Sequence, residues 1–378
     1  TTGKAAMKTL HLDINAPEFV ADPYPRLAEL RESTPVFFDP VWNKLFFTRY
    51  HDIAALLRDK RLGRSILHRL SRDELGWPPP NPLTKDFDQF QSHHMLDNEP
   101  PKHTRLKSLV MKAFTPARVE GLRTKIESIV NRMLDQAEDR GKMDLLQDYA
   151  EPLPVAVIAE LLGVPEEDQH LLRPWSSSIV KLYELGYSDQ QAVQANQAVV
   201  EFSDYIKALA DERRKNPQDD LITALVQVEE QGEMLTEDEL VANCILLLNA
   251  GHEATVNGTT AGFLSLSRNP DQMNLAKQAA REGNQDFFKA AVEEMLRYDT
   301  PLPMFERWVL EDGVTLRYPT GFVHLPKVDA EFVQQLCAEQ LITRRDRNGF
   351  PIREWQKMRE RNEALDCYVY ARAAASAA

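Results

Sequence analysis

The chain has 378 residues, of which 43% are hydrophobic and 27% are charged, and its formal net charge is −13. Ordinary apolar content with abundant charge is typical of a globular protein, and this length allows one large domain or two smaller ones. The longest apolar runs, such as Cys244 to Leu248, are far shorter than the ~20 residues that span a bilayer, so we expect no membrane partner. Three cysteines without CxxC spacing argue against a disulfide framework or zinc cage and predict a cytoplasmic protein.

The charge is unevenly distributed along the chain. Residues 314–378 contain ten Lys/Arg and eight Asp/Glu, so the first 313 residues carry a net charge of −15. An acidic body repels phosphates, and we therefore do not expect nucleic acid as a partner. The same charge is compatible with a basic redox partner.

Periodicity predicts a mainly helical body. The first expected elements are a helix from about Asp22 to Leu30 and a two-stranded hairpin formed by Pro35–Phe38 and Leu45–Thr48. Further helices are expected over 52–58, 103–113, 116–136, 191–215 and 286–298, and a turn-rich loop over 77–82.

The most informative expected helix begins after Thr236. Thr236 and Glu239 have the spacing of a capping box, and an apolar run of roughly thirty residues follows, ending near Arg268. At 1.5 Å per residue this helix is about 45 Å long, so we expect it to cross the domain and to be buried at its middle.

Two residues near the centre of this run are unusual for a buried helix. Gly251 costs ~1 kcal/mol relative to Ala, which suggests that another group approaches the backbone closely there. Glu253 is a carboxylate in apolar surroundings, where burial is expensive without a partner. It has two interpretations: proton delivery to a reacting group, or a side chain that turns to solvent or a polar pocket.

Four stretches, taken in order, resemble cytochrome P-450 over about residues 8–313. They are His103-Thr104-Arg105-Leu106-Lys107 with the following Ala113-Phe114-Thr115-Pro116, then Ala250-Gly251-His252-Glu253-Ala254-Thr255, then Glu294-Met295-Leu296-Arg297, and finally Phe305-Glu306-Arg307-Trp308. The resemblance implies a mainly α, incomplete P-450 fold with a small β portion. It also implies a haem cofactor, oxygen-dependent hydroxylation of a small hydrophobic substrate and a ferredoxin-type redox partner.

The resemblance also assigns roles to individual residues. Glu253 and Thr255 are the implied catalytic residues, and Glu294 with Arg297 is the implied structural clamp. The implied haem contacts are His103, Lys107, Ala250, Gly251 and Arg307.

The sequence departs from the family pattern at two of these places. Ala254 stands where an alcohol is expected, and Thr255 is one residue later, about 100° further round the helix. Lys107 stands where arginine is usual, which keeps the charge but loses the bidentate fork. Without the resemblance, Glu294 and Arg297 would be a surface ion pair worth ~0–1 kcal/mol, and His103 an ordinary surface residue.

The haem-ligating loop of the family, FxxGxxxCxG, has no counterpart in this sequence. Cys244 lies inside the central helix, and Cys337 and Cys367 lie in stretches of helical character without nearby glycines. A tight loop under the porphyrin needs glycine, and the iron needs a thiolate. We therefore predict no metal ligand and no credible haem-ligating cysteine, and activity is doubtful.

Residues from about 317 to 378 resemble the C-terminal end of the phage terminase large subunit of the GpA type. This resemblance implies a short α/β fragment of a metal-dependent nuclease, with Asp366 as a candidate acidic residue. A bound divalent metal is not expected, because the other nuclease carboxylates and a GxxxxGK[ST] motif are missing. An ordinary helical surface appendage, with Asp366 in a salt bridge, is the simpler alternative.

These observations predict two domains, at 1–313 and 314–378. Three functions stay open: a monooxygenase lineage that is inactive as written, a non-catalytic binding module, and a fragment of a DNA-packaging terminase or nuclease. We expect pocket-shaping loops around 77–94 and 175–187, and an exposed apolar patch where the family's C-terminal segment is missing.

Overall fold

The computed structural model describes residues 8–183, 186–228 and 232–310, together with the backbone of three strands at 320–324, 339–345 and 351–357. Contacts divide the chain into two compact units, each described here by itself. The first unit comprises residues 1–253 and 302–326, and the second comprises 254–301 and 327–378.

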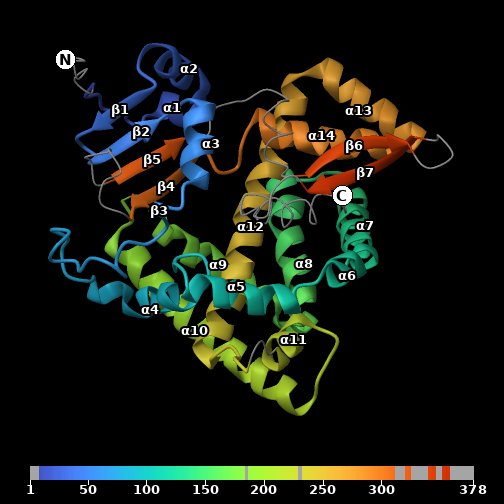
Figure 1. The fold of residues 1–378 in the computed structure, drawn as a ribbon. Coiled ribbons are helices and arrows are strands. Elements are labelled where there is room, and N and C mark those ends of the chain that lie inside the picture. The colour runs from blue at the N-terminus through green and yellow to red at the C-terminus, as the bar shows by residue number, and fades with distance from the viewer. Residues whose placement is uncertain are drawn as a thin grey trace. The chain divides into compact units, whose positions relative to one another are not determined.

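Helices dominate the first unit (Figure 1). They are α1 (Pro17–Ala21), α2 (Tyr24–Ser33), α3 (Tyr50–Arg58), α4 (Lys85–His93), α5 (Lys102–Ala113), α6 (Pro116–Gly121), α7 (Arg123–Arg140), α8 (Pro152–Leu162), α9 (Gln169–Val180), α10 (Asp189–Lys215), α11 (Leu221–Gln227) and the first half of α12 (Glu237–Arg268). Single turns of other helix types lie at η1 (Pro82–Thr84), η2 (Leu146–Ala150), η3 (Glu166–Asp168) and η4 (Lys181–Tyr183).

The mainly helical fold expected from the sequence is confirmed, with one clear difference in the helices. The helix expected over 116–136 is divided at Leu122 into α6 and α7. Thr115 caps α6 by accepting a hydrogen bond from the Arg118 amide, and Gly121, a poor helix former, ends it. A change of direction at 121–122 therefore replaces the single long helix.

A five-stranded sheet begins with the hairpin that the alternating aromatic residues predicted. β1 (Val36–Asp39) and β2 (Lys44–Phe47) are antiparallel, with Val36 opposite Phe47. The carboxylate of Asp39 is buried and accepts hydrogen bonds from the amides of Leu12 and Val41. Asp39 therefore fixes both the hairpin turn and the N-terminal segment that runs beside it.

The remaining strands of this sheet come from distant parts of the chain. They are β3 (Leu62–Gly63), β4 (Met304–Val309) and β5 (Thr320–His324), and the order across the sheet is β1-β2-β5-β4-β3. β5 lies between β2 and β4 (Figure 1). It is parallel to β2 and antiparallel to β4. A strand that follows residue 313 therefore joins β2 to β4.

The second unit contains the rest of α12, α13 (Pro270–Glu282), α14 (Gln285–Tyr298) and the antiparallel hairpin β6 (Glu339–Arg345) and β7 (Pro351–Lys357). α12 and α14 approach closely, because a Cβ atom at Gly262 would lie 2.8 Å from Sδ of Met295. Large apolar side chains are nevertheless exposed in this unit, namely those of Phe263, Leu264, Leu275 and Tyr298. The single apolar patch expected from the sequence stays a prediction.

No helix among the described residues is both long enough and apolar enough to cross a membrane.

The position of β5 generates a test of the sheet. In a chain that ends at residue 319, β2 and β4 lose their shared neighbour, so their backbone amides lose hydrogen-bond partners. We expect those amides of residues 45–47 and 304–308 that face β5 to exchange with deuterium faster in this truncated chain than in the full chain. The amides of α10 are the internal control, and equal protection of β2 and β4 in both chains would contradict the topology.

Candidate functional site

The first half of α12 places the central motif. Its N-terminus has the predicted capping box: the Thr236 amide donates to Oε2 of Glu239 at 3.0 Å, and the Glu239 amide donates to Oγ1 of Thr236 at 3.2 Å. Residues 240–249 are buried on every side of the helix. A helix that is buried all round is held in both position and rotation by its neighbours, so residues 250–253 are precisely placed in the first unit.

α5 is attached to the start of the same helix. Arg105 forms an ion pair with Glu239, and the Met95 amide, in the segment before α5, donates to Oδ1 of Asn243 at 3.2 Å. Arg105 and the Thr236 amide, both bonded to Glu239, lower the pKa of its carboxyl against the opposing effect of burial. The charged pair therefore positions α5, which carries two of the candidate haem contacts.

The three candidate cations are partly exposed on two elements. His103 and Lys107 are four residues apart on α5 and so lie on one of its faces. Arg307 lies on β4, where its Nη1 donates to the Glu306 carbonyl at 3.0 Å. Next to it, the Glu306 side chain pairs with Lys44. These positions are compatible with anion binding, and the propionate role stays a prediction.

The motif residues of α12 differ in their surroundings. Ala250 is exposed although the ten residues before it are buried, and Glu253 is partly exposed. Gly251 faces α8, where a Cβ atom at this position would lie 2.6 Å from Cδ1 of Ile158. The close approach inferred from Gly251 is therefore made, at least on this side, by an isoleucine of α8.

The structure also shows a contact between α9 and α12 that no sequence pattern indicates. His252 is buried between the motif residues, and its Nδ1 lies 3.0 Å from Oγ of Ser176 on α9, which is also buried. Burial, and to a smaller extent the charge of Arg173, lower the pKa of His252 to about 4. His252 is therefore neutral at physiological pH and connects α9 to α12.

The remaining predicted residues lie elsewhere. Thr255 belongs to the second unit, as do Glu294 and Arg297 on α14. Arg297 donates from Nε to Oε2 of Glu294 at 2.7 Å and from Nη2 to Oε1 at 2.5 Å, so the expected pair forms in bidentate geometry. The Glu294 side chain is 58% exposed, and Arg297 lowers the pKa of its carboxyl. Asp366 lies outside the described residues.

One of the three cysteines lies in the described part of the chain. Cys244 is completely buried within α12, and burial raises the pKa of its thiol to about 12. A thiol in this environment stays protonated, whereas iron ligation requires the thiolate. Cys337 and Cys367 lie outside the described residues. Within the described residues, no group of three or more His, Cys, Asp or Glu side chains is arranged to hold a metal ion.

The two segments expected to shape a pocket do meet in the first unit. Phe87 and Tyr183 are in edge-to-face contact with ring centroids 5.6 Å apart, and Tyr183 donates from its hydroxyl to Oε1 of Gln91 at 3.0 Å. Instead of loops, however, the first segment contains α4, and the second contains the end of α9 and η4. Aromatic packing at Phe87 and Phe90 accounts for this order.

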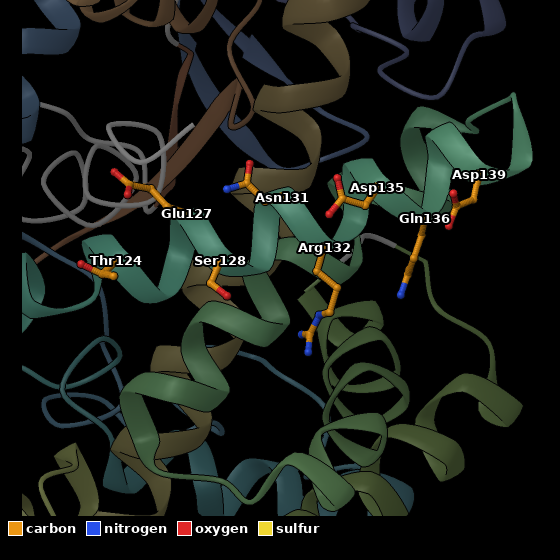
Figure 2. Close-up of a pocket in the computed structure, with 8 residues that line it drawn as sticks. All are labelled: Thr124, Glu127, Ser128, Asn131, Arg132, Asp135, Gln136 and Asp139. Carbon is orange, nitrogen blue, oxygen red and sulfur yellow. The ribbon is translucent and has the colours of Figure 1, made fainter.

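A shallow depression of about 590 Å³ lies along α7, and Figure 2 shows the side chains that line it. Its lining is polar and comes from this single helix: Thr124, Glu127, Ser128, Asn131, Arg132, Asp135, Gln136 and Asp139. Small-molecule sites are mostly apolar and concave, and none of the candidate site residues is among this set. We therefore do not consider this depression to be the ligand site.

Comparison with known protein families gives two matches. The profile described as "Cytochrome P450" matches residues 54–319, and that described as "Terminase large subunit gpA, endonuclease domain" matches residues 284–378. Both resemblances expected from the sequence are thereby confirmed. The two matches overlap from residue 284 to residue 319, a range that contains α14 and β4.

Individual relatives extend the first match. The chain is 37% identical over 313 residues to polyketide biosynthesis cytochrome P450 PksS of Bacillus subtilis, covering 81% of this chain and 74% of that protein. It is 36% identical over 330 residues to the cytochrome P450 monooxygenase PikC of Streptomyces venezuelae, covering 85% and 71% respectively.

Solved structures agree with these relatives. P450BioI, in complex with an acyl carrier protein carrying hexadec-9Z-enoic acid, matches with a TM-score of 0.75 at 27% identity, covering 96% of this chain and 91% of that one. The structure of Bacillus subtilis PksS matches with a TM-score of 0.72 at 35% identity, covering 84% and 78%.

The contact at Gly251 predicts the effect of filling that space. In Gly251→Ala, the added methyl group overlaps Ile158, and we expect a loss of about 1–3 kcal/mol in the free energy of unfolding despite the better helix propensity of Ala. Ile158→Val removes the atom in conflict, so the double variant should be more stable than the sum of the single changes predicts. Urea denaturation measures all three variants.

Gly121→Ala is the matched control for this experiment. No atom lies within 4 Å of a Cβ atom built at Gly121, so this change should leave stability unaltered or raise it slightly. Strictly additive effects of Gly251→Ala and Ile158→Val would show that the two positions do not compete for space.

Two buried histidines predict a pH dependence of stability. Burial lowers the pKa of His94, like that of His252, to about 4, compared with 6.5 in the unfolded chain. Between these pH values the unfolded chain binds more protons than the folded chain. The contribution of each neutral histidine to the free energy of unfolding is therefore complete above about pH 6.5. It is lost as the pH falls towards 4, by at most about 3 kcal/mol for each histidine.

Urea midpoints measured from about pH 7 to pH 4 test this dependence. The variant with His94→Gln and His252→Gln should show a shallower loss of stability across this window than the unaltered chain. His170→Gln, which changes an exposed histidine, is the control and should keep the original slope. Equal slopes for all three proteins would contradict the assignment.

Proposed function

Because this chain belongs to the cytochrome P450 family, we propose that it is a monooxygenase-type protein by ancestry that does not itself carry out the family's oxygen-dependent hydroxylation. The observation that supports this proposal is the set of cysteines. Of the three in the sequence, the described one is buried as a neutral thiol within α12, and the other two are in stretches without the glycines of a haem-ligating loop.

The described residues provide some of the contacts that a haem needs, namely a small residue beside its face and cations for its carboxylates. Ala250 is a small exposed residue on an otherwise buried stretch of α12, and His103, Lys107 and Arg307 supply positive charge for carboxylates. When bound to a family member through a thiolate, the haem supplies the oxygen chemistry. Cys244, the cysteine in the described part of the chain, is not a thiolate, so the described residues by themselves do not fit a thiolate-bound haem. In this proposal Glu253 and Thr255 are present in the motif but do not take part in a reaction.

What the body keeps, in our proposal, is the capacity to bind a small hydrophobic molecule. The aromatic contact between Phe87 and Tyr183 joins the two segments expected to shape a pocket, and Phe90 packs beside Phe87. P450BioI was solved with a fatty acyl group on its carrier protein. This agrees with a hydrophobic ligand class, and a non-catalytic binding module is therefore the most specific role that we propose. We propose a ferredoxin-type redox partner only for the case in which the protein binds haem.

The division of the chain is also a proposal. We place the P450-like domain at residues 1–313 and the terminase-like fragment at 314–378. The second family match supports a terminase origin for the tail, with Asp366 as its candidate acidic residue. A nuclease function is less well supported, because the sequence has no GxxxxGK[ST] motif and the first 313 residues carry a net charge of −15.

A carbon monoxide difference spectrum of the reduced, haem-supplemented protein tests the proposed loss of activity. We expect no Soret band at the position typical of thiolate-bound haem, because the buried Cys244 thiol resists ionisation. The matched control is a chimera in which the residues after Leu310 are replaced by the corresponding C-terminal segment of Bacillus subtilis PksS. This chimera should show the band.

The opposite result would be informative about the ligand. A thiolate band in the unaltered chain would overturn the proposal, and its loss in Cys244→Ala, Cys337→Ala or Cys367→Ala would identify the cysteine responsible.

A further inference from the structure

Two polar side chains in the middle of α12 are buried with some of their polar atoms not hydrogen-bonded to any described residue. Asn249 is 6% exposed and His252 is 2% exposed. Within the described part of the chain, neither Oδ1 nor Nδ2 of Asn249 has a hydrogen-bond partner, and neither has Nε2 of His252. The two residues are three apart in the helix, so their side chains lie on the same face.

The lack of hydrogen-bond partners is energetically costly, and it is unlike the other buried asparagine of α12. More than nine in ten buried polar groups in proteins are hydrogen-bonded, and one left without a partner loses its hydration with no compensation. Asn243, two turns earlier in α12, follows the rule: its Nδ2 donates to the Glu239 carbonyl at 2.7 Å, and its Oδ1 accepts from the Met95 amide. The pair at 249 and 252 therefore requires a ligand that the described residues do not supply.

We propose that Asn249 and His252 bind an ordered water molecule in the interior of the first unit, beside Ser176. The imidazole needs one partner at Nε2, and which partner depends on Ser176. If the serine hydroxyl donates to Nδ1, then Nε2 carries a hydrogen and donates to the water, which donates to Oδ1 of Asn249. If Nδ1 donates to the serine, the water donates to Nε2 and accepts from Nδ2 of Asn249. A water molecule satisfies both residues in either tautomer.

The charges nearby favour a neutral ligand. Arg173, which acts on His252 electrostatically, is already paired with Glu151, so it leaves no net charge to bind an anion. His252 is neutral at physiological pH, and no carboxylate is bonded to it in the described residues. Water, which donates and accepts equally, matches an amide and a neutral imidazole.

The bound water has a structural consequence. His252 is already bonded to Ser176, so the water extends a chain of hydrogen bonds from α9 through the imidazole to Asn249 on α12. Gly251 lies within this stretch and packs on α8. The water is thus part of the contact that fixes the motif of α12 relative to α9.

Stability measurements on the full chain test the proposal. If a water bridges the two residues, Asn249→Leu and His252→Phe should each lower the urea midpoint, and the double variant should lose less than the sum of the two losses. If Asn249 is truly without a partner, Asn249→Leu should raise the midpoint, which would overturn the proposal. His252→Phe by itself does not decide the question, because it also removes the bond to Ser176. Asn243→Leu removes two observed hydrogen bonds and should lower the midpoint in either case.

A second measurement does not depend on how well the variants fold. In the unaltered chain labelled with 15N-histidine, the ring of His252 should show a nuclear Overhauser effect to a long-lived water. Relaxation dispersion in 17O-enriched water should count at least one long-lived water more in the unaltered chain than in Asn249→Leu. The absence of the ring-to-water effect, or an equal count in both chains, would show that the site is dry.

Discussion

The structure of the first unit depends on the burial of the first half of α12 on all sides. Residues 240–249 present apolar surface in every direction, so the helix is stable only where other elements enclose it completely. α8 approaches at Gly251, α9 contacts His252, and α5 is attached through Arg105 and Glu239. A change at any of these contacts leaves part of an apolar helix open to water, and each of them therefore influences the placement of the motif that follows.

The sequence predicted those features that are encoded locally. The capping box at Thr236 and Glu239, the β1–β2 hairpin and the C-terminal end of α10 all follow from the spacing of neighbouring residues. The start of α10 at Asp189 lies two residues before the predicted start. α8 escaped prediction because nine of its eleven residues are buried, which removes the contrast between an apolar and a polar face. The bond between Ser176 and His252 joins positions 76 residues apart, and no local pattern reports it. Gly251 and Glu253 were noticeable from the sequence alone, whereas the candidate cations and the roles of the motif residues were predictable only through the family resemblance.

Membership of the P450 family and the family's chemistry depend on different physical features of a chain. The fold of the first unit is supported by apolar burial and hydrogen bonds distributed over many helices, so it does not depend on any single residue. Thiolate ligation instead depends on one ionised sulfur in one glycine-rich loop. The buried thiol of Cys244 shows how poorly an interior cysteine replaces such a ligand, because its surroundings oppose ionisation. Resemblance over most of a chain is therefore evidence for a fold, and the reaction needs separate evidence.

The parallel pairing of β2 with β5 has a consequence for synthesis of the protein. Leu45 is opposite Gly321, so after Leu45 another 276 residues must be translated up to and including its partner Gly321. At about 5–20 residues per second, the ribosome needs roughly 14–55 s to deliver the second strand. During this interval the nascent β1–β2 hairpin has an open edge with unpaired backbone groups, which are attractive to other strands. We therefore expect the β1–β2 hairpin to be the part of the nascent sheet that is most open to pairing with other chains until β5 has been synthesised.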